Sequence, residues 1–343
     1  MKKIILIITI VILLALYLWQ IFIPVDSNSN EQISISVEKG QTTRDIALNL
    51  QEKGLIKLGP IFRLYVLLNG SAKKLQAGTY QFSKSMNLVQ IAGKLATGET
   101  MKEKLTIIEG WNLRNIGSYL ESKELFQSSD FWLVSGLPAT DYSKEADLPK
   151  PFDFSDKYEF LESKPENVGL EGFLFPDTYE ISKELKVEDI IKKMLDNFNQ
   201  KFTIQLKEEI SRQNKTIFEI ITMASILEKE VQGKEDKEIV SGIFWKRIKL
   251  QKQLESCATI AYIKGVDQWQ YSFQDSRIDS PFNTYINYGL PLGPISNPGM
   301  ESILAAIYPQ SSEYLYFLST PEGQTIYSKT YQEHLQAKAE YLD

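Results

Sequence analysis

The N-terminal segment of the chain is almost wholly apolar. Residues 4–23 form a run of twenty residues with two polar interruptions, directly after Lys2 and Lys3. A helix of this length spans a hydrocarbon core of roughly 30 Å, and Tyr17 and Trp19 lie near its far end, as interfacial aromatics do. The pattern predicts a single-pass anchor in the cell (inner or cytoplasmic) membrane, with a cytoplasmic N-terminus and an extracytoplasmic bulk. A cleaved signal peptide is the alternative, but the run is long for one and no small-residue cleavage site follows.

After a short polar linker, one hydrophobic pattern occurs twice. Residues 36–56 align without gaps to residues 106–126, with six identities that include the turn glycines Gly40 and Gly110. Each copy predicts a strand, a glycine turn and an amphipathic helix. A partial third copy, residues 86–95, follows another strand-like segment. The pattern resembles LysM-type modules, which bind amino-sugar glycans, although strand–turn–helix units also look alike without shared function.

The rest of the chain alternates turn-rich and helical patterns, so the predicted fold class is α+β. Residues 137–168 are rich in Pro, Asp, Ser and Lys, which predicts an irregular connection. Helices are predicted at 187–213, 217–231, 235–250 and 300–309, hairpin strands at 314–320 and 325–328, and a charged helix at the C-terminus. The predicted organisation is 1–23 (cytoplasmic stub and transmembrane anchor), 24–32 (linker), 33–130 (LysM-like α/β subdomain), 131–168 (irregular connection) and 169–343 (C-terminal α+β domain).

Composition narrows the chemistry. The net charge of −6 argues against broad nucleic-acid binding, which usually needs a basic surface. Cys257 is the only cysteine, so no internal disulfide is possible, and His334 is the only histidine. Ser-His-Asp, Cys-His and multi-histidine metal sites would all depend on that one imidazole. We therefore expect any chemistry to rest on carboxylates, hydroxyls, amides or lysines.

Two carboxylates stand where an apolar helical run stops, in the segment MASILEKE (residues 223–230). On a helix, Glu228 shares a face with Ser225, and Glu230 shares another face with Leu227. A carboxyl group beside apolar surface is desolvated, which raises its pKa and suits a general acid. The alternative is that the helix emerges into water at Glu228 and that these acids belong to a solvated end.

A later loop, residues 280–299, is rich in glycine and proline. Five of these residues within Gly289–Pro298 fix the path of the backbone. Asn283, Thr284 and Tyr285 add amide and hydroxyl groups, and the loop is suited to a sugar cleft. A purely structural crossover loop is the alternative.

Four motifs in order carry a family resemblance: LEGFLFPDTY, MASILEKE, SPFNTYINYGLPLGPISNPG and YLYFLS…YSKTYQEH. Behind an N-terminal anchor, they resemble the MltG (YceG-like) endolytic murein transglycosylases. The resemblance implies a catalytic domain in residues 169–343 that cuts nascent peptidoglycan strands internally at the MurNAc–GlcNAc bond, leaving 1,6-anhydro-N-acetylmuramic acid ends. The enzyme class is a lyase acting on polysaccharides. The family's catalytic glutamate falls on Glu228, and Glu230 is the fallback.

The implied reaction needs one carboxyl group, whereas ordinary glycoside hydrolysis uses two. Glu228 would protonate the leaving oxygen and then accept the proton of the C6 hydroxyl that closes onto the anomeric carbon. No metal or cofactor is needed, in keeping with the histidine count. The residues expected to contact substrate or to support the site are Ser225, Glu171, Asp177, Thr259, Tyr262, Asn283, Thr284 and Tyr285.

The chain departs from the family pattern at two places. Cys257-Ala258 stands where many relatives have Asp-Pro, and Thr325 stands where relatives often have histidine. Two other function classes stay open: a non-catalytic cell-wall-binding scaffold, and a peptidoglycan hydrolase in which Glu171 or Asp177 activates water. The expected partners are glycan strands, the membrane and, from the resemblance, cell-wall synthesis proteins, with no nucleic acid.

Overall fold

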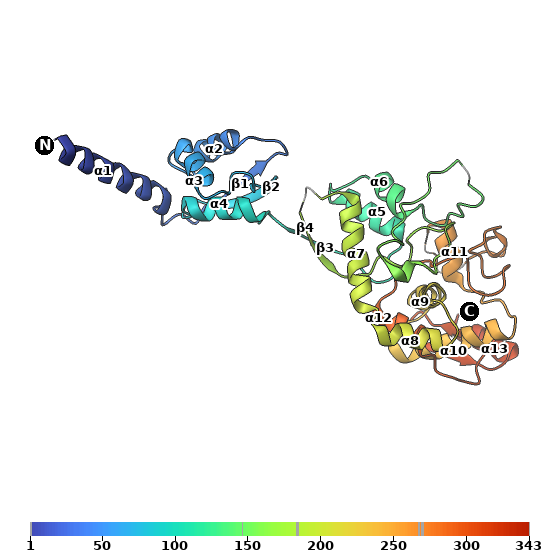
Figure 1. Cartoon of the computed structure of the whole chain (residues 1–343). Coiled ribbons are helices and arrows are strands. Elements are labelled where there is room, and N and C mark those ends of the chain that lie inside the picture. The colour runs from blue at the N-terminus through green and yellow to red at the C-terminus, as the bar shows by residue number, and fades with distance from the viewer. Residues whose placement is uncertain (1, 146, 183–184, 267, 269–270, 343) are drawn as a thin grey trace. The chain divides into compact units, whose positions relative to one another are not determined.

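The computed structural model describes residues 2–145, 147–182, 185–266, 268 and 271–342 (Figure 1). By its internal contacts the chain divides into unit 1, Met1–Leu105 with Glu180–Leu185, and unit 2, Thr106–Tyr179 with Lys186–Asp343. Two of the crossings between units fall within strands β3 (Glu103–Thr106) and β4 (Thr178–Ile181), which pair in a two-stranded sheet. The mixture of helices and strands confirms the predicted α+β class.

Unit 1 contains a second two-stranded sheet with helices packed on it. Its strands are antiparallel, and Gln32 lies opposite Ser83 at one end while Val37 lies opposite Gly78 at the other. Capping boxes at Thr42 and at the corresponding start of α4 fix where two of the helices begin. The elements are α1 (Lys2–Phe22), β1 (Gln32–Val37), α2 (Thr43–Glu52), α3 (Gly59–Leu68), β2 (Gly78–Ser83) and α4 (Leu88–Thr97).

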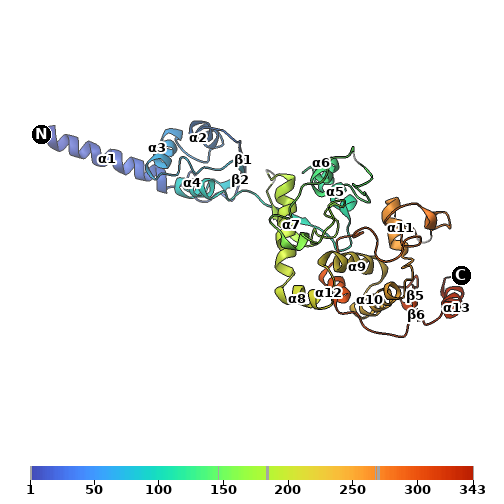
Figure 2. The same cartoon turned by 45° about the vertical axis from the view of Figure 1, so that its right-hand side comes forward.

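Unit 2 is mainly helical and is arranged around α9 (Ile217–Glu230). Its eight consecutive residues 220–227 are buried, because α8, α10, α11 and α12 all pack against this helix (Figures 1 and 2). A capping box between Thr216 and Glu219 starts α9, and Val231, in an extended conformation, ends it. In the last turn of α9, Lys229 is exposed, whereas Glu228 and Glu230 stay largely buried. The other elements are α5 (Leu113–Ser122), α6 (Ser128–Ser135), η1 (Glu159–Leu161), α7 (Val187–Lys201), α8 (Ile204–Arg212), α10 (Lys234–Lys249), α11 (Cys257–Lys264), η2 (Asp275–Arg277), α12 (Met300–Ile307), β5 (Tyr316–Ser319), β6 (Thr325–Ser328) and α13 (Tyr331–Tyr341).

The predicted elements are present with some changes at their ends. Both repeat copies form a strand, a turn with a positive-φ glycine (Gly40 at +94° and Gly110 at +79°) and a helix. The helix predicted at 187–213 is two helices, α7 and α8, and α3, α6 and α11 were not predicted. Residues 137–168 contain only the short η1 among those described, and residue 146 of that segment lies outside the described residues. The LysM-like character of unit 1 and the domain boundaries stay predictions.

Candidate active site

The Glu228 carboxyl group lies against the first residues of α12. Its Oε2 atom accepts hydrogen bonds from the Gly299 N–H at 3.0 Å and from the Ser302 hydroxyl at 2.6 Å. Its Oε1 atom lies 3.5 Å from the Lys237 ammonium nitrogen on α10, and the two side chains are only 10% and 6% exposed. Lys237 is a basic partner that the sequence analysis did not identify. All three neighbours, together with the positive end of the α12 dipole, stabilise a negative charge on Glu228.

A second carboxyl group, that of Glu109 in the loop before α5, also lies close to the start of α12. The loop is held by two backbone hydrogen bonds, from Gly110 N–H to Asn297 O at 2.9 Å and from Asn297 N–H to Trp111 O at 2.8 Å. A Cβ atom added to Gly299 would lie 2.1 Å from the Glu109 Oε1 atom, and one added to Gly110 would lie 3.5 Å from the Glu228 Cγ atom. Both carboxyl groups therefore lie beside Gly299.

The pKa of Glu109 is raised, first by partial burial and then by the negative charge of Glu228, while Lys237 opposes the shift. Glu109 was not among the residues predicted from the sequence, although the repeat carries a signal for it. The residue before the turn glycine is Lys39 in the first copy and Glu109 in the second, a change from a base to an acid at equivalent positions.

Glu230, two residues further along α9, faces a different helix. Its Oε1 atom accepts hydrogen bonds from the Ser256 hydroxyl and, at 3.4 Å, from the Ala258 N–H, at the start of α11. Burial raises the pKa of Glu230, against the effect of these donors. The two motif carboxyls thus each occupy the N-terminal end of a separate helix, Glu228 at α12 and Glu230 at α11.

Four of the predicted polar residues are fully buried and bonded within the protein: Ser225, Thr259, Asn283 and Thr284. Thr284 Oγ1 accepts from the Ser256 N–H at 3.0 Å and lies 3.0 Å from the Thr259 hydroxyl. Asn283 Nδ2 donates to two backbone carbonyls of the preceding loop, and Ser225 Oγ accepts from the Ile295 N–H at 3.0 Å. These contacts support a structural role rather than direct contact with a substrate.

Tyr285 is half-buried, and its hydroxyl group lies 3.0 Å from the Cys257 sulfur atom at the first turn of α11. Burial raises the pKa of both groups. At the other departure from the family pattern, Thr325 donates to Asp236 Oδ2 at 2.7 Å, and Tyr327 donates to Asp236 Oδ1 at 2.6 Å. His334, the only histidine in the sequence, lies on α13 and stacks on the ring of Tyr316. Burial lowers the pKa of His334.

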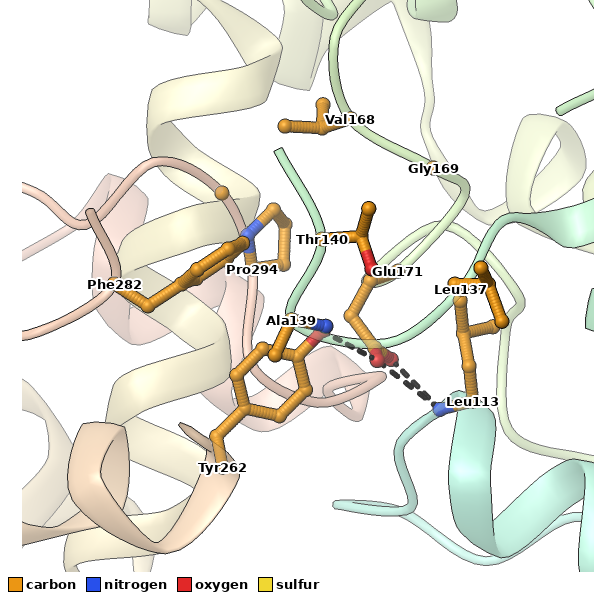
Figure 3. A pocket seen from close by; sticks show the side chains of 11 residues that line it. Leu113, Leu137, Ala139, Thr140, Val168, Gly169, Glu171, Tyr262, Phe282 and Pro294 are labelled. Carbon is orange, nitrogen blue, oxygen red and sulfur yellow. Dashed lines mark hydrogen bonds between the residues drawn. The ribbon is translucent and has the colours of Figure 1, made fainter. Parts of the chain in front are cut away.

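Glu171 is buried beside a small cavity and is hydrogen-bonded to residues around it (Figure 3). Its carboxyl group accepts from the Leu113 N–H at 3.0 Å, from the Tyr262 hydroxyl at 3.1 Å and from the Asn297 amide at 3.1 Å. Burial raises the pKa of Glu171 to about 8, against the opposing effect of these donors and of Arg114. The cavity beside it measures about 10 Å³, room for roughly one water molecule. A sugar ring does not fit there.

Asp177 is exposed and ties the end of the LEGFLFPDTY segment to α7. It accepts from the Asn197 amide at 2.9 Å and from the Thr178 N–H at 2.7 Å, and the Asn197 bond is the main cause of its lowered pKa. The hydrogen bonds of Asp177 thus connect it to α7 and β4.

The fold defines an α+β protein in which several carboxyl groups lie close together, and comparison with known proteins identifies its family. The model of the YceG-like family matches residues 35–340, so the chain belongs to the YceG-like family. An endolytic murein transglycosylase from Bacillus subtilis (strain 168) is 32% identical over 332 residues, which cover 93% of this chain and 87% of that protein.

Two further comparisons agree. An endolytic murein transglycosylase from Streptococcus pneumoniae (strain ATCC BAA-255 / R6) is 29% identical over 349 residues, covering 95% of this chain and 61% of that longer protein. The crystal structure of a YceG-like protein from Listeria monocytogenes superposes with a TM-score of 0.59 at 31% identity, over 90% of this chain and 99% of that one. The family resemblance predicted from the motifs is confirmed.

Proposed function

We propose that this chain is a membrane-anchored endolytic peptidoglycan lytic transglycosylase with Glu228 as its acid and base. The observation that carries the proposal is the nearly dry carboxyl group of Glu228, held in place by the Gly299 N–H, Ser302 and Lys237. A side chain fixed by three contacts is pre-organised for proton transfer, whereas a solvated helix end would leave it mobile. The names of the Bacillus and pneumococcal relatives give the reaction class.

In the proposed reaction, the Glu228 carboxyl proton passes to the glycosidic oxygen as the bond from the muramic acid C1 atom breaks. The C6 hydroxyl oxygen of the same sugar forms the new bond to C1, and its proton returns to the Glu228 carboxylate. The products are a 1,6-anhydro end and a free GlcNAc hydroxyl, and no water is consumed. The donors around Glu228 favour the carboxylate that the second half of the cycle requires.

Glu109 is proposed as a positioning residue that helps to keep one proton at the site. Two carboxyl groups beside one another disfavour simultaneous ionisation, so such a pair retains a proton more readily than an isolated carboxyl does. The effect of the Glu228 charge on the pKa of Glu109 is one expression of this coupling. A second carboxyl group beside the first therefore offsets the preference for negative charge that the surrounding donors create at the site.

The anchor is proposed to be α1, with Lys2 and Lys3 on the cytoplasmic side and the rest of the chain outside the cytoplasm. Among the described residues, α1 is the one helix long and apolar enough to cross a membrane. Its 21 residues give a length of about 31 Å. The proposed substrate is therefore glycan close to the membrane surface, and cell-wall synthesis proteins are proposed neighbours.

The test is the chemistry of the products. Purified uncrosslinked glycan strands are digested with the full chain in detergent, and the new ends are identified by mass spectrometry. Internal fragments with anhydro ends, one water lighter than reducing ends, are expected. Reducing ends would select the hydrolase, for which the small cavity at Glu171 offers little room. Intact strands would select the non-catalytic wall-binding scaffold.

A further inference from the structure

Helix α3 is apolar on both of its faces. Phe62 and Val66 are fully buried in the core of unit 1, as expected for the inner face of an amphipathic helix. The outer face, however, carries Leu64, Leu67 and Leu68, and the last two are each 69% exposed. Arg63 is the only charged residue of the helix. A helix that is apolar all round needs a second apolar surface to cover it.

One of the neighbours of α3 is α1, the proposed anchor helix. Helix α1 packs against α3 within unit 1, and in both views the C-terminal end of α1 lies beside α3 (Figures 1 and 2). Lys57, just before α3, joins them: its ammonium group lies 3.8 Å from the centre of the Trp19 ring and donates to the Ile23 carbonyl at 3.1 Å. The start of α3 is therefore fixed at the point where the chain leaves the proposed span.

The charges around α3 have one sign. Residues 57–74 contain four basic residues and no acidic one, although the chain as a whole carries a net charge of −6. Three of the four, Arg63, Lys73 and Lys74, are exposed. Exposed leucines beside lysine and arginine are the composition of helices that lie in the interface of an anionic membrane.

We propose that α3 lies in the membrane interface, with Leu64, Leu67 and Leu68 in the lipid and the basic residues of 57–74 against anionic headgroups. This inference rests on the proposed anchoring by α1, which brings α3 to the bilayer. Unit 1 then meets the membrane at two places, one spanning and one superficial. Two attachments fix the orientation of unit 1 on the bilayer, which a single helix followed by a flexible connection does not.

The test measures the depth of α3 in the full-length chain. A nitroxide label is attached to Leu67→Cys in a Cys257→Ser background, and the chain is reconstituted into vesicles of phosphatidylcholine with one-third phosphatidylglycerol. Collision rates with oxygen, which concentrates in lipid, and with a water-soluble nickel chelate are measured by electron paramagnetic resonance. Labels at Leu13→Cys, within α1, and at Lys39→Cys, on the exposed turn after β1, serve as the lipid and water references.

We expect the label at position 67 to collide with oxygen severalfold more than the label at position 39, and with the nickel chelate severalfold less. Equal behaviour of positions 67 and 39 would overturn the inference while leaving the anchor intact. Shielding of position 67 from both reagents would also overturn it, because protein rather than lipid would then cover the helix. If position 13 itself behaves as water-exposed, the proposed anchor fails and this inference fails with it.

A charge variant tests the second half of the inference. In Lys73→Gln/Lys74→Gln, the label at position 67 is expected to become more accessible to the nickel chelate in the anionic vesicles. In pure phosphatidylcholine, the parent chain and the variant should behave alike. Lys39→Gln is the matched control and should leave the depth unchanged. An unchanged depth in the Lys73/Lys74 variant would contradict the headgroup contact. Cleavage of soluble glycan strands is a separate measurement that tests the proposed function alone.

Discussion

Gly299 lies between two carboxyl groups, and its lack of a side chain is what leaves room for one of them. Its N–H donates to Glu228, and the Glu109 carboxyl occupies the space where a Cβ atom would stand. The backbone of Gly299 has φ −74° and ψ 168°, a conformation open to any residue, so the requirement for glycine here comes from the neighbouring acid. A substitution of Gly299 can thus change the distance between the Glu228 and Glu109 carboxyl groups while both acids are kept.

Removing the influence of Glu109 should shift the pH profile of cleavage. In Glu109→Gln the second carboxyl group of the pair is gone, so two acids no longer share a proton at the site and the alkaline limb of kcat/KM moves to lower pH. Gly299→Ala should move it in the same direction by displacing the exposed Glu109 side chain, with little effect on thermal stability. The measurement is kcat/KM against pH. Glu162→Gln, an exposed acid of unit 2, controls for net charge, and a wild-type profile in both test variants would refute the role of Glu109.

Lys237 and Glu228 form an ion pair that is almost fully buried. Removing only one partner should therefore lower the free energy of unfolding strongly. Lys237→Met leaves the Glu228 carboxylate without its cation, and we expect the free energy of unfolding to fall by about 3–5 kcal/mol. In Lys237→Met/Glu228→Gln the buried charge is removed as well, so the loss should be smaller than the sum of the two single losses. Denaturant unfolding of the four proteins measures the coupling. Strict additivity would show that the pair contributes nothing to stability.

At the scale of elements, three separate segments of the chain meet at the buried carboxyl group of Glu171. Glu171 receives hydrogen bonds from the first residue of α5, from Tyr262 on α11 and from Asn297 in the Gly/Pro-rich loop. Asn297 also pairs with Trp111, the residue two before α5. Glu171 therefore helps to hold the loops that bring Glu109 and Gly299 together, although it does not touch them itself.

The raised pKa of Glu171 predicts a pH dependence of stability. Its pKa is about 8 in the folded protein against 4.5 for an ordinary glutamate, so between these values the folded state binds more protons than the unfolded state. Stability should therefore fall as pH rises from 4.5 to 8, by up to about 1.4 kcal/mol per pH unit from this group. Denaturant unfolding at several pH values, compared between wild type and Glu171→Gln, isolates the contribution. Equal slopes would show that Glu171 ionises at an ordinary pH.

Hydrophobic periodicity located most helices and strands, and two elements that it predicted wrongly or missed can each be explained by a contact in the structure. The helix predicted at 187–213 is broken because Phe202 leaves the helical conformation to stack on Phe198, with ring centres 5.1 Å apart, and Thr203 then starts α8. Helix α11 has only eight residues, and groups at its start donate hydrogen bonds to Glu230, a contact that no local pattern reveals. A local contact accompanies the first failure, and a tertiary contact accompanies the second.

At the scale of the whole molecule, the candidate site could be predicted from the sequence only in part. Glu228 was located by the end of an apolar run and by the family motif. Glu109 and Lys237 were not, because Glu109 stands 119 residues before Glu228 and reaches it only through the pairing of two loops. The predicted residues Asn283 and Thr284 are polar but buried, and a sequence pattern does not distinguish a polar group that faces substrate from one that closes a loop.

The proposed anchor makes a simple prediction about where the molecule is found. The full chain should remain in the membrane pellet after washing with alkaline carbonate, because about twenty apolar residues of α1 would lie in the hydrocarbon core of the bilayer. A chain without residues 2–22 should be released by the same wash. The fraction in pellet and supernatant is measured by immunoblotting. Retention of the shortened chain after carbonate treatment would mean that α1 is not the main attachment.

The two acids of MASILEKE provide the most direct test of the central claim. Glu228→Gln and Glu230→Gln change the same chemical group two residues apart, one at α12 and one at α11, so each is the matched control of the other. The measurement is the rate of formation of anhydro ends from uncrosslinked glycan strands, with circular dichroism to verify folding. We predict that Glu228→Gln lowers the rate by about 10²–10⁴-fold and that Glu230→Gln retains most of it. A folded Glu228→Gln protein that cleaves at the wild-type rate would contradict the assignment of Glu228 as the acid and base.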